Sequence, residues 1–294
     1  MSRLRHKKAG DYVLDIGIYC ILTFMGLITL LPFANVLSKS VSEEWAIVAG
    51  KVGVFPRGFQ LDTMRFVVTS DQFIHSFLIS AFVTIVGTLA SILFTAMTAY
   101  PLSKRELPGM GVLIVLFIFT MMFSGGIIPN YLLLRELGML NHLSSLILPA
   151  LISVFNLLVV KSYFESLPPS LEESAKLDGA KNIGILFRIL LPLSGPVLAT
   201  VGLFYAVYYW NDYFNPMLYI NSTSLKPLQL YLQDIVMNAD TSTALSMSAD
   251  DMMNVPAEGI RAATVIASTI PILLVYPFLQ RYFIKGVLIG SVKG

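Results

Sequence analysis

The residues best suited to recognising a solute gather between positions 205 and 215. Four tyrosines, one tryptophan, two asparagines and one aspartate occur there. A sugar ring has apolar faces, on which aromatic side chains stack, and hydroxyl edges that bond to amides and carboxylates. An aspartate in an apolar helix is costly unless it faces water or a partner. The sequence therefore predicts a solute-contacting pathway cluster made of Tyr205, Tyr209, Trp210, Asn211, Asp212 and Asn215.

The same cluster is compatible with an aromatic belt at the outer membrane interface. Trp210 lies 15 residues after Gly195, the expected inner end of its span, which is roughly 22 Å along a helix. That distance reaches the outer part of a bilayer. The belt and the pathway both stay open as interpretations of this cluster.

A second candidate lies in the segment Ser124–Tyr131, which contains two adjacent glycines and a proline. Proline cannot continue a helical hydrogen-bond ladder, so a break in the helix is expected here. The break could form a gate in a pathway. Tight packing of helices through small residues is the alternative. The gate candidates are Gly125, Gly126, Pro129 and Asn130.

Catalytic patterns are missing from the sequence. No phosphate-binding G-x-x-x-x-G-K-[ST] loop, H-E-x-x-H pair or G-x-S-x-G elbow occurs. The three histidines, His6, His75 and His142, are far apart, and Cys20 is the single cysteine. We therefore expect no catalytic residues, no metal site and no cofactor bound by this chain.

The composition places the chain in a membrane. Its 294 residues are 55% hydrophobic and 13% charged, with a mean hydropathy of +0.73, whereas soluble domains carry about 25% charged residues. The net charge of +2 offers no basic stripe for nucleic acid. These values exclude a soluble enzyme, a disordered chain and a nucleic-acid binder.

Six stretches are long and apolar enough to cross a bilayer as helices, which needs roughly 20 residues each. Strict alternation of apolar and polar residues is absent, which disfavours a β-barrel. The predicted fold class is an all-α polytopic membrane protein with six transmembrane helices. They are expected at Tyr12–Val36, Phe73–Leu102, Gly111–Leu134, Leu143–Phe164, Gly195–Ile220 and Ile260–Ile284.

The distribution of basic residues predicts the orientation of the chain. With the N-terminus inside, 13 of the 20 Lys and Arg residues fall in inner segments and 7 in outer ones, as the positive-inside rule requires. Both termini are therefore expected in the cytoplasm, and the first span is expected to be retained rather than cleaved as a signal peptide. We expect one transmembrane domain over 1–294, with a cytoplasmic N-terminus 1–11 and long outer loops 38–72 and 221–259.

The inner loop 165–192 lies between the fourth and fifth spans. Ser170 is a predicted N-cap, and Glu173 would complete a capping box with it. Gly179 is the predicted C′ residue, where a positive φ is required, so a short helix is expected over Leu171–Asp178. A second helix is expected to bury Ile183, Leu186, Phe187 and Leu190 on one face and to stop at Pro192. A capped helix lying on the membrane surface would give the same pattern.

This loop resembles the EAA motif of ABC importer permeases, E-A-A-x-x-x-G followed by I-x-L-P. The matching residues are Glu173, Ser174, Ala175, Gly179, Ile189, Leu191 and Pro192, and only Ser174 departs, replacing an alanine. Asp178-Gly179-Ala180 is similar to the form found in carbohydrate-uptake permeases. Further resemblance lies in Ala99–Lys104, Trp210–Phe214, Tyr276–Phe283 and Lys285–Gly294. The tail is similar to a subgroup that includes the second permease subunits of importers for alginate and pectin-derived oligosaccharides.

The resemblance implies a type I ABC importer permease that takes up an oligosaccharide or another sugar by alternating access. It implies four kinds of partner besides membrane lipid: a second homologous permease subunit, two copies of a cytoplasmic ATPase subunit, an extracytoplasmic solute-binding protein, and ATP with Mg²⁺ held by the ATPase. It also implies a location in a bacterial cytoplasmic membrane. The residues implied to couple to the ATPase are Leu171, Glu172, Glu173, Ser174, Ala175, Asp178 and Gly179.

Two other functions stay open from the sequence. One is a permease of the same architecture for a non-sugar solute. The other is a self-sufficient secondary transporter, against which the absence of an inverted repeat argues.

Overall fold

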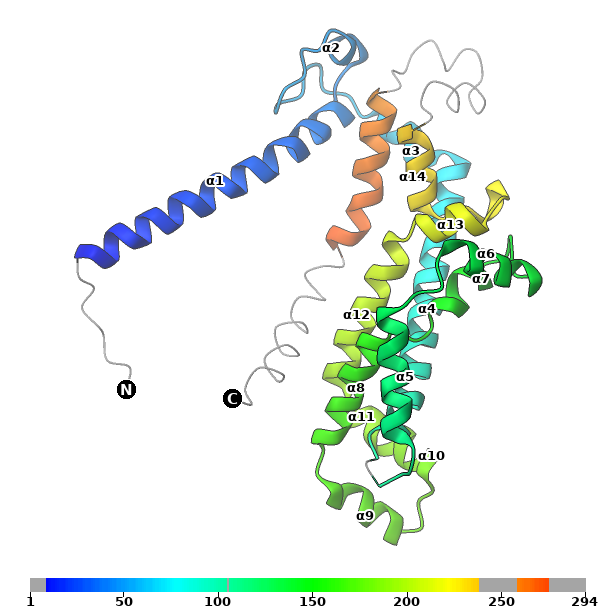
Figure 1. The fold of residues 1–294 in the computed structure, drawn as a ribbon. Coiled ribbons are helices and arrows are strands. Elements are labelled where there is room, and N and C mark those ends of the chain that lie inside the picture. The colour runs from blue at the N-terminus through cyan, green and yellow to red at the C-terminus, as the bar shows by residue number, and fades with distance from the viewer. Residues whose placement is uncertain (1–8, 105, 238–257, 275–294) are drawn as a thin grey trace. The chain divides into compact units, whose positions relative to one another are not determined.

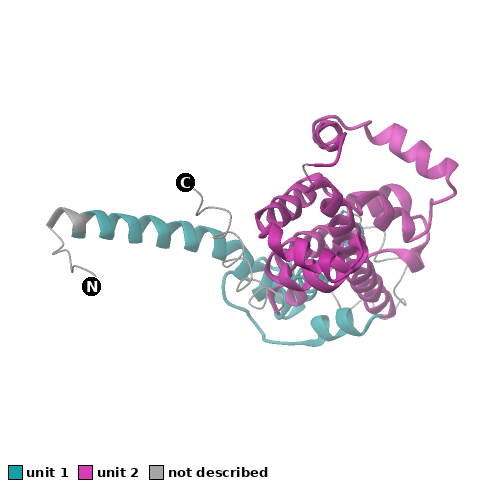
Figure 2. Ribbon diagram, turned by 90° about the horizontal axis from the view of Figure 1, so that it is seen from below, with its two compact units in different colours: residues 1–70, 234–269 teal, residues 71–233, 270–294 magenta. Residues whose placement is uncertain are grey.

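The computed structural model describes residues 9–104, 106–237 and 258–274. These residues are helical, apart from connecting turns and one isolated antiparallel bridge between Ser42 and Phe59 (Figure 1). The chain divides into two compact units, residues 1–70 with 234–269 and residues 71–233 with 270–294 (Figure 2). Each unit is described by itself.

The first unit begins with α1 (Ala9–Ser40), which is followed by the short helices α2 (Glu44–Val48) and α3 (Asp62–Thr69). The apolar side chains of α1 are exposed on every side of the helix: Tyr19 is 70% exposed, Phe24 64% and Leu30 62%. A helix that is apolar all round requires lipid or another apolar partner. The residues that follow fold back, since the Asn35 amide donates to the carbonyls of Val52 and Gly53 at 3.2 and 2.9 Å.

The second unit is built around α4 (Asp71–Leu102), which packs mainly against α12 (Gly195–Asn211) and α8 (Val154–Ser166). Along the chain between α4 and α12 lie α5 (Met110–Met122), α6 (Ile127–Glu136), α7 (Ser144–Ile147), the 3₁₀ turn η1 (Leu148–Ala150) and α8. They are followed by α9 (Pro169–Leu177), α10 (Asn182–Ile185), the π-helical turn η2 (Leu186–Leu190) and α11 (Leu191–Leu193). After α12 come α13 (Phe214–Tyr219), η3 (Thr223–Leu225) and α14 (Leu228–Met237), which runs across the boundary between the units. Residues 258–274 are helical as well.

Two helices in the described part of the chain are each long and apolar enough to cross a membrane, within α1 and α4. Up to five spans result when three bent helix pairs each count as one. These pairs bend by 111° between α5 and α6, by 47° before α8, and by 84° before α12. The predicted sixth span, Ile260–Ile284, is described only as far as residue 274. The predicted tail motifs and residues 238–257 of the outer loop 221–259 lie outside the described residues.

The structure corrects the expectation of uninterrupted helices over Leu143–Phe164, which is bent by 47°, and over Gly195–Ile220, whose helix ends at Asn211. The break in the third span was expected from its glycines and is confirmed, with Gly126 at φ +89°. Pro149 lies in η1 just before the break in the fourth span, where its missing N–H weakens a continuous helix. The fifth span ends at Asn211, because Asp212 is extended and its carboxylate accepts the amide N–H of Asn215 at the start of α13, at 3.1 Å.

Candidate functional site

The inner loop forms the predicted short helix, but its N-terminus differs from the prediction. α9 begins at Pro169, with Pro168 as its N-cap and no side-chain cap bond. Proline is favoured at the first helical position because its φ is already helical and it has no N–H to satisfy. Ser170 therefore lies inside the helix, and the expected capping box between Ser170 and Glu173 is wrong.

The C-terminus of α9 matches the prediction. Gly179 has φ +80°, its N–H donates to the Lys176 carbonyl at 3.0 Å, and the Ala180 N–H donates to the Ala175 carbonyl at 2.9 Å. This pair of bonds is a Schellman motif, which satisfies the last carbonyls of the helix. Gly179 therefore fixes where α9 ends and in which direction the chain leaves it.

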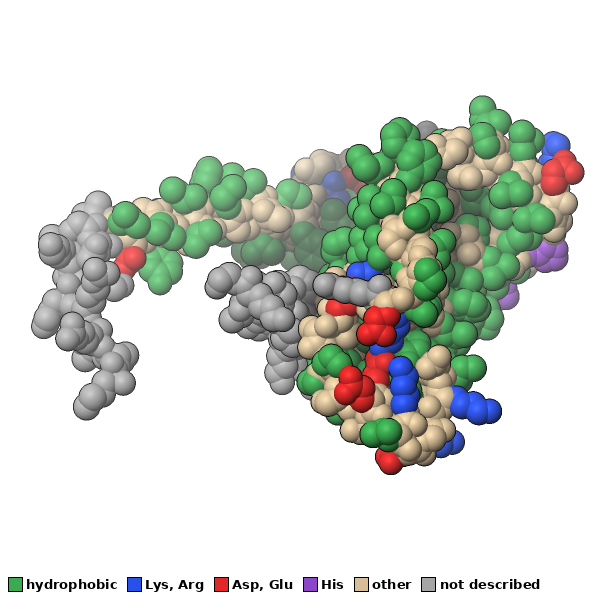
Figure 3. Space-filling model, turned by 60° about the horizontal axis from the view of Figure 1, so that its bottom comes forward, with side chains coloured by type: hydrophobic (Ala, Val, Ile, Leu, Met, Phe, Trp, Pro, Cys, Tyr) green, Lys and Arg blue, Asp and Glu red, His purple; other side chains and the backbone are tan. Residues whose placement is uncertain are grey.

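The predicted coupling residues of α9 face in two directions. Ala175 is buried, and the Glu172 side chain is only 15% exposed because it forms an ion pair with Lys104. Glu173, Ser174 and Asp178 are exposed. Leu177, which the sequence prediction omitted, is 89% exposed. The sequence feature that could have indicated Leu177 is a large apolar residue in an otherwise polar loop. α9 lies at one end of the second unit (Figure 1), and Figure 3 shows acidic and basic side chains gathered at this end, beside hydrophobic helices.

The stretch after α9 differs from the predicted amphipathic helix. Ile183 is 73% exposed and Phe187 41%, whereas Ile185, Leu186 and Leu190 are at most 4% exposed. Pro192 lies within α11, and the helix ends one residue after it, at Leu193, before the 84° bend that leads to α12. In a regular α-helix its ring would meet the carbonyl four residues earlier. The π-helical turn η2 directly before it widens the helix and rotates the buried face relative to a regular 3.6-residue repeat.

Two of the predicted pathway tyrosines bind the broken fourth span to α4. The Tyr205 hydroxyl accepts the Ser153 backbone N–H at 2.9 Å and pairs with the Thr95 hydroxyl at 2.7 Å. The Tyr209 hydroxyl pairs with Ser91 at 2.9 Å and donates to the Ile147 carbonyl at 3.3 Å. Both tyrosines are buried. The Tyr205 hydroxyl thereby satisfies the Ser153 N–H, which lies in the break between η1 and α8.

The other predicted pathway residues lie near the end of α12. The Trp210 ring packs edge-on against Phe77 at 5.9 Å, and Asn211 donates to the Val207 carbonyl of its own helix at 2.9 Å. Asp212 accepts from the Asn215 side-chain amide at 2.8 Å, and that amide also donates to the Tyr208 hydroxyl at 3.3 Å. Asp212 and Asn215 therefore form a polar turn that lies beside Tyr208.

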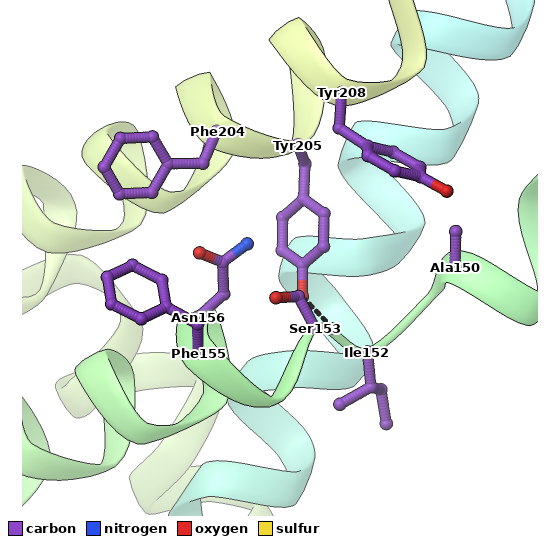
Figure 4. A pocket seen from close by; sticks show the side chains of 8 residues that line it. All are labelled: Ala150, Ile152, Ser153, Phe155, Asn156, Phe204, Tyr205 and Tyr208. Carbon is purple, nitrogen blue, oxygen red and sulfur yellow. Dashed lines mark hydrogen bonds between the residues drawn. The ribbon is translucent and has the colours of Figure 1, made fainter. Parts of the chain in front are cut away.

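A pocket of about 420 Å³ lies where α12 passes the break before α8 (Figure 4). Phe155 is 53% exposed and Tyr208 45%, and the Phe155 ring lies 6.1 Å from that of Phe204. Asn156 is 4% exposed, and its side-chain amide forms no hydrogen bond within the described residues. Figure 4 shows its amide between the two phenylalanines and Tyr205. Aromatic faces around an unpaired amide suit a ligand with both apolar and hydroxyl surfaces.

A second pocket, of about 490 Å³, shares Tyr208 with the first. Its lining brings together Asn130, from the predicted gate, and Asn215, from the predicted pathway. Trp210 and Asn211 line neither pocket. The sequence missed Asn156, Phe155 and Phe204, because an asparagine and two phenylalanines in apolar spans carry no signal apart from their place at a helix break.

No cluster of three or more His, Cys, Asp or Glu side chains that could hold a metal ion occurs in the part of the chain that the structure describes. The polar groups of the two pockets are neutral hydroxyls and amides.

Comparison with known proteins gives consistent matches. Residues 107–289 match the family described as binding-protein-dependent transport system inner membrane component. The chain is 44% identical to protein LplC of Bacillus subtilis strain 168, covering 99% of this chain and 98% of that protein. It is also 44% identical to the polygalacturonan/rhamnogalacturonan transport system permease protein YtcP of the same strain, covering 95% and 98%.

A solved structure gives a similarly extensive match. It is a crystal structure of a bacterial ABC transporter involved in the import of the acidic polysaccharide alginate. One of its chains is 30% identical to this chain with a TM-score of 0.88, and the match covers 95% of this chain and 99% of that one.

Proposed function

Because this chain belongs to the family of binding-protein-dependent transport system inner membrane components, we propose that it is a permease subunit of an ATP-driven importer of oligosaccharides. The single observation that carries the coupling part of this proposal is the exposed face of α9. Leu177 is 89% exposed at the end of a short helix, beside exposed Glu173 and Asp178. An exposed apolar side chain surrounded by polar ones matches the apolar core and polar rim of a protein–protein interface.

The partners follow from the family. The importer pairs this chain with a second homologous permease, two copies of a cytoplasmic ATPase subunit and an extracytoplasmic solute-binding protein. ATP and Mg²⁺ bind to the ATPase, and this chain performs no catalysis. α9 contacts the ATPase from the cytoplasmic side of the bacterial membrane, where both termini of the single permease domain also lie. The exposed apolar surface of α1 supports contact with lipid or the second permease.

The oligosaccharide passes by the two pockets that share Tyr208. The rings of Phe155, Phe204 and Tyr208 stack against a sugar face, and the Asn156 amide bonds a hydroxyl. Asn130 and Asn215 in the second pocket supply further neutral polar groups. YtcP is named for polygalacturonan and rhamnogalacturonan. An acidic sugar would find no positive charge in either pocket of this chain, so recognition of its carboxylates falls to other subunits.

The break at Gly125 and Gly126 places Asn130 in the second pocket, and we propose that this break, with Pro129, serves as the gate. Trp210, which packs on Phe77 and lines neither pocket, belongs to the outer aromatic belt on this proposal. Tyr205 and Tyr209 support the pathway by holding the broken fourth span in place.

The experiment combines assembly with uptake in proteoliposomes that contain all subunits. Leu177→Ala should weaken retention of the ATPase on the purified permease, because removing a buried interface anchor typically costs about 2 kcal/mol or more. Leu137→Ala is the matched control, since Leu137 is 61% exposed near the end of α6 and lies outside the proposed contact.

The second arm concerns the solute. Asn156→Leu should lower ATP-dependent uptake of a galacturonan oligosaccharide while leaving ATPase retention unchanged. Normal uptake by this variant would exclude the first pocket from the pathway. Uptake of an amino acid but of no oligosaccharide would favour a non-sugar permease. Uptake without any ATPase subunit would favour a self-sufficient transporter.

A further inference from the structure

α9 has few apolar contacts that could hold it against its own chain. Ala175 is its buried residue, while Leu171 is 37% and Leu177 89% exposed. A helix of nine residues is marginal on its own in water. The polar contacts of α9 therefore determine which other helix is displaced together with α9.

One such contact joins α9 to the end of α4. The Glu172 carboxylate forms an ion pair with Lys104, and the two side chains are 15% and 29% exposed. The Lys104 ammonium also lies 4.8 Å from the centre of the Tyr100 ring, within the range of a cation–π interaction. We call these three residues the clamp.

Lys104 of the clamp lies in a hydrogen-bonded turn at the end of α4. The Lys104 N–H donates to the Pro101 carbonyl at 3.1 Å, and the Ser103 N–H donates to the Ala99 carbonyl at 2.9 Å. The Ser103 hydroxyl donates to the Tyr100 carbonyl at 2.7 Å. These bonds hold the Lys104 backbone to the last turn of α4, so a force on Lys104 acts on α4 itself.

α4 extends from the clamp to the other end of the second unit, about 48 Å for its 32 residues. On the way, Ser91 and Thr95 bond to the hydroxyls of Tyr209 and Tyr205. At its far end, His75 bonds to the Ser224 carbonyl at 2.7 Å, and Gln72 donates to the Thr223 carbonyl at 3.2 Å. α4 and the turn directly after it therefore contact α9, the α12 tyrosines Tyr205 and Tyr209, and the segment 223–225.

We propose that Glu172 is a positioning residue that ties α9 to α4 through Lys104 and Tyr100, so that α4 carries the displacement of α9 to the pocket and to the segment 223–225. This inference rests on the proposed function, in which the ATPase moves α9. It assigns Glu172 to the inside of the permease, whereas Glu173 and Leu177 face the ATPase.

The test measures solute molecules imported per ATP hydrolysed, in proteoliposomes with the complete importer. Glu172→Gln and Lys104→Met should each retain the ATPase but lower this ratio roughly fivefold or more, the lower end of typical coupling factors. The charge swap Lys104→Glu with Glu172→Lys should restore most of the ratio, because it re-forms the pair with reversed polarity. Lys161→Met is the matched control, since Lys161 pairs with Glu165 at similar burial but within the single helix α8.

A distance measurement keeps the test decisive if uptake is too low to quantify. Spin labels are attached at Met97 on α4 and Lys176 on α9, which are both exposed. In the otherwise unaltered protein the distance between the two labels should be the same with and without ATP. With Glu172→Gln the separation should change on ATP binding.

Import ratios within twofold of the unaltered importer for both single variants, or unchanged label distances in Glu172→Gln, would overturn the inference. Failure of the unaltered permease to retain any ATPase would instead contradict the proposed function.

Discussion

Gly87 is the position at which one added methyl group should disturb the packing of α4 on α12 most directly. A Cβ built on Gly87 would lie 2.8 Å from two carbons of the Tyr209 ring. That ring is 4% exposed and its hydroxyl is bonded to both Ser91 and Ile147, so it cannot rotate away without losing those bonds. Gly202 provides the control: its Cβ would meet the end of the Ile92 side chain at the same 2.8 Å, and a terminal methyl can move by a change of rotamer.

The expected magnitude follows from four contributions, of which the first cancels. Both variants replace glycine by alanine inside a helix, which favours folding by about 1 kcal/mol in each case and cancels in the comparison. Overpacking at Gly87→Ala costs about 1–3 kcal/mol, and weakening the two Tyr209 hydroxyl bonds costs up to about 1 kcal/mol each. A rotamer change of Ile92 in Gly202→Ala costs about 1 kcal/mol. Gly87→Ala should therefore lower the free energy of unfolding by about 2 kcal/mol more than Gly202→Ala.

The assay is a titration of the purified permease from mild detergent into dodecyl sulfate, followed by tryptophan fluorescence. The chain has two tryptophans, so a Trp45→Phe background leaves Trp210, the neighbour of Tyr209, as the probe. Combining Gly87→Ala with Tyr209→Leu should cost less than the sum of the two single variants, because the smaller side chain removes the clash. Equal midpoints for Gly87→Ala and Gly202→Ala would refute the reasoning.

Three other outcomes are expected. Gly179→Val should abolish ATPase retention and uptake, whereas Gly179→Asn should keep both, because asparagine tolerates the φ of +80° far better than a β-branched residue. Equal loss in the two variants would show that the backbone conformation at this position is not the reason. Tyr205→Phe should lower the free energy of unfolding by about 1–3 kcal/mol, since the Ser153 N–H then has no partner; an unchanged titration midpoint would contradict this role. In a Cys20→Ser background and in cells that express the permease without the ATPase, an impermeant maleimide should label Leu137→Cys in intact cells and Leu177→Cys only after permeabilisation; the reverse would invert the proposed orientation.

The sequence predicted best those features that depend on local backbone chemistry. The positive φ of Gly179, the break at Gly126 and the family follow from residue types at fixed spacing. The start of α9 was wrong because two signals competed there. Pro169 at the first helical position prevailed over the serine and glutamate of a capping box.

The sequence could not predict which polar side chains bond to other parts of the same chain and are therefore not available to a solute. Tyr205 and Tyr209 looked like solute contacts, but their hydroxyls are bonded to Ser153, Thr95, Ser91 and Ile147. Their partners lie at least 50 residues away in the sequence and become visible only once the fourth span is seen to be broken. The same holds for Glu172, whose partner Lys104 lies in the turn after α4.

The hydroxyl pairs between α4 and α12 also constrain how these two helices can move past each other. Ser91 pairs with Tyr209, and Thr95 pairs with Tyr205, so donors and acceptors repeat every four residues along both antiparallel helices. A slide of a fraction of a turn would leave both pairs broken among side chains that are at most 4% exposed. A slide of four residues, about 6 Å, would bring Thr95 opposite Tyr209 or Ser91 opposite Tyr205 and keep one pair. Relative translation of α4 and α12 is therefore restricted to discrete steps, and smaller displacements must carry both helices together.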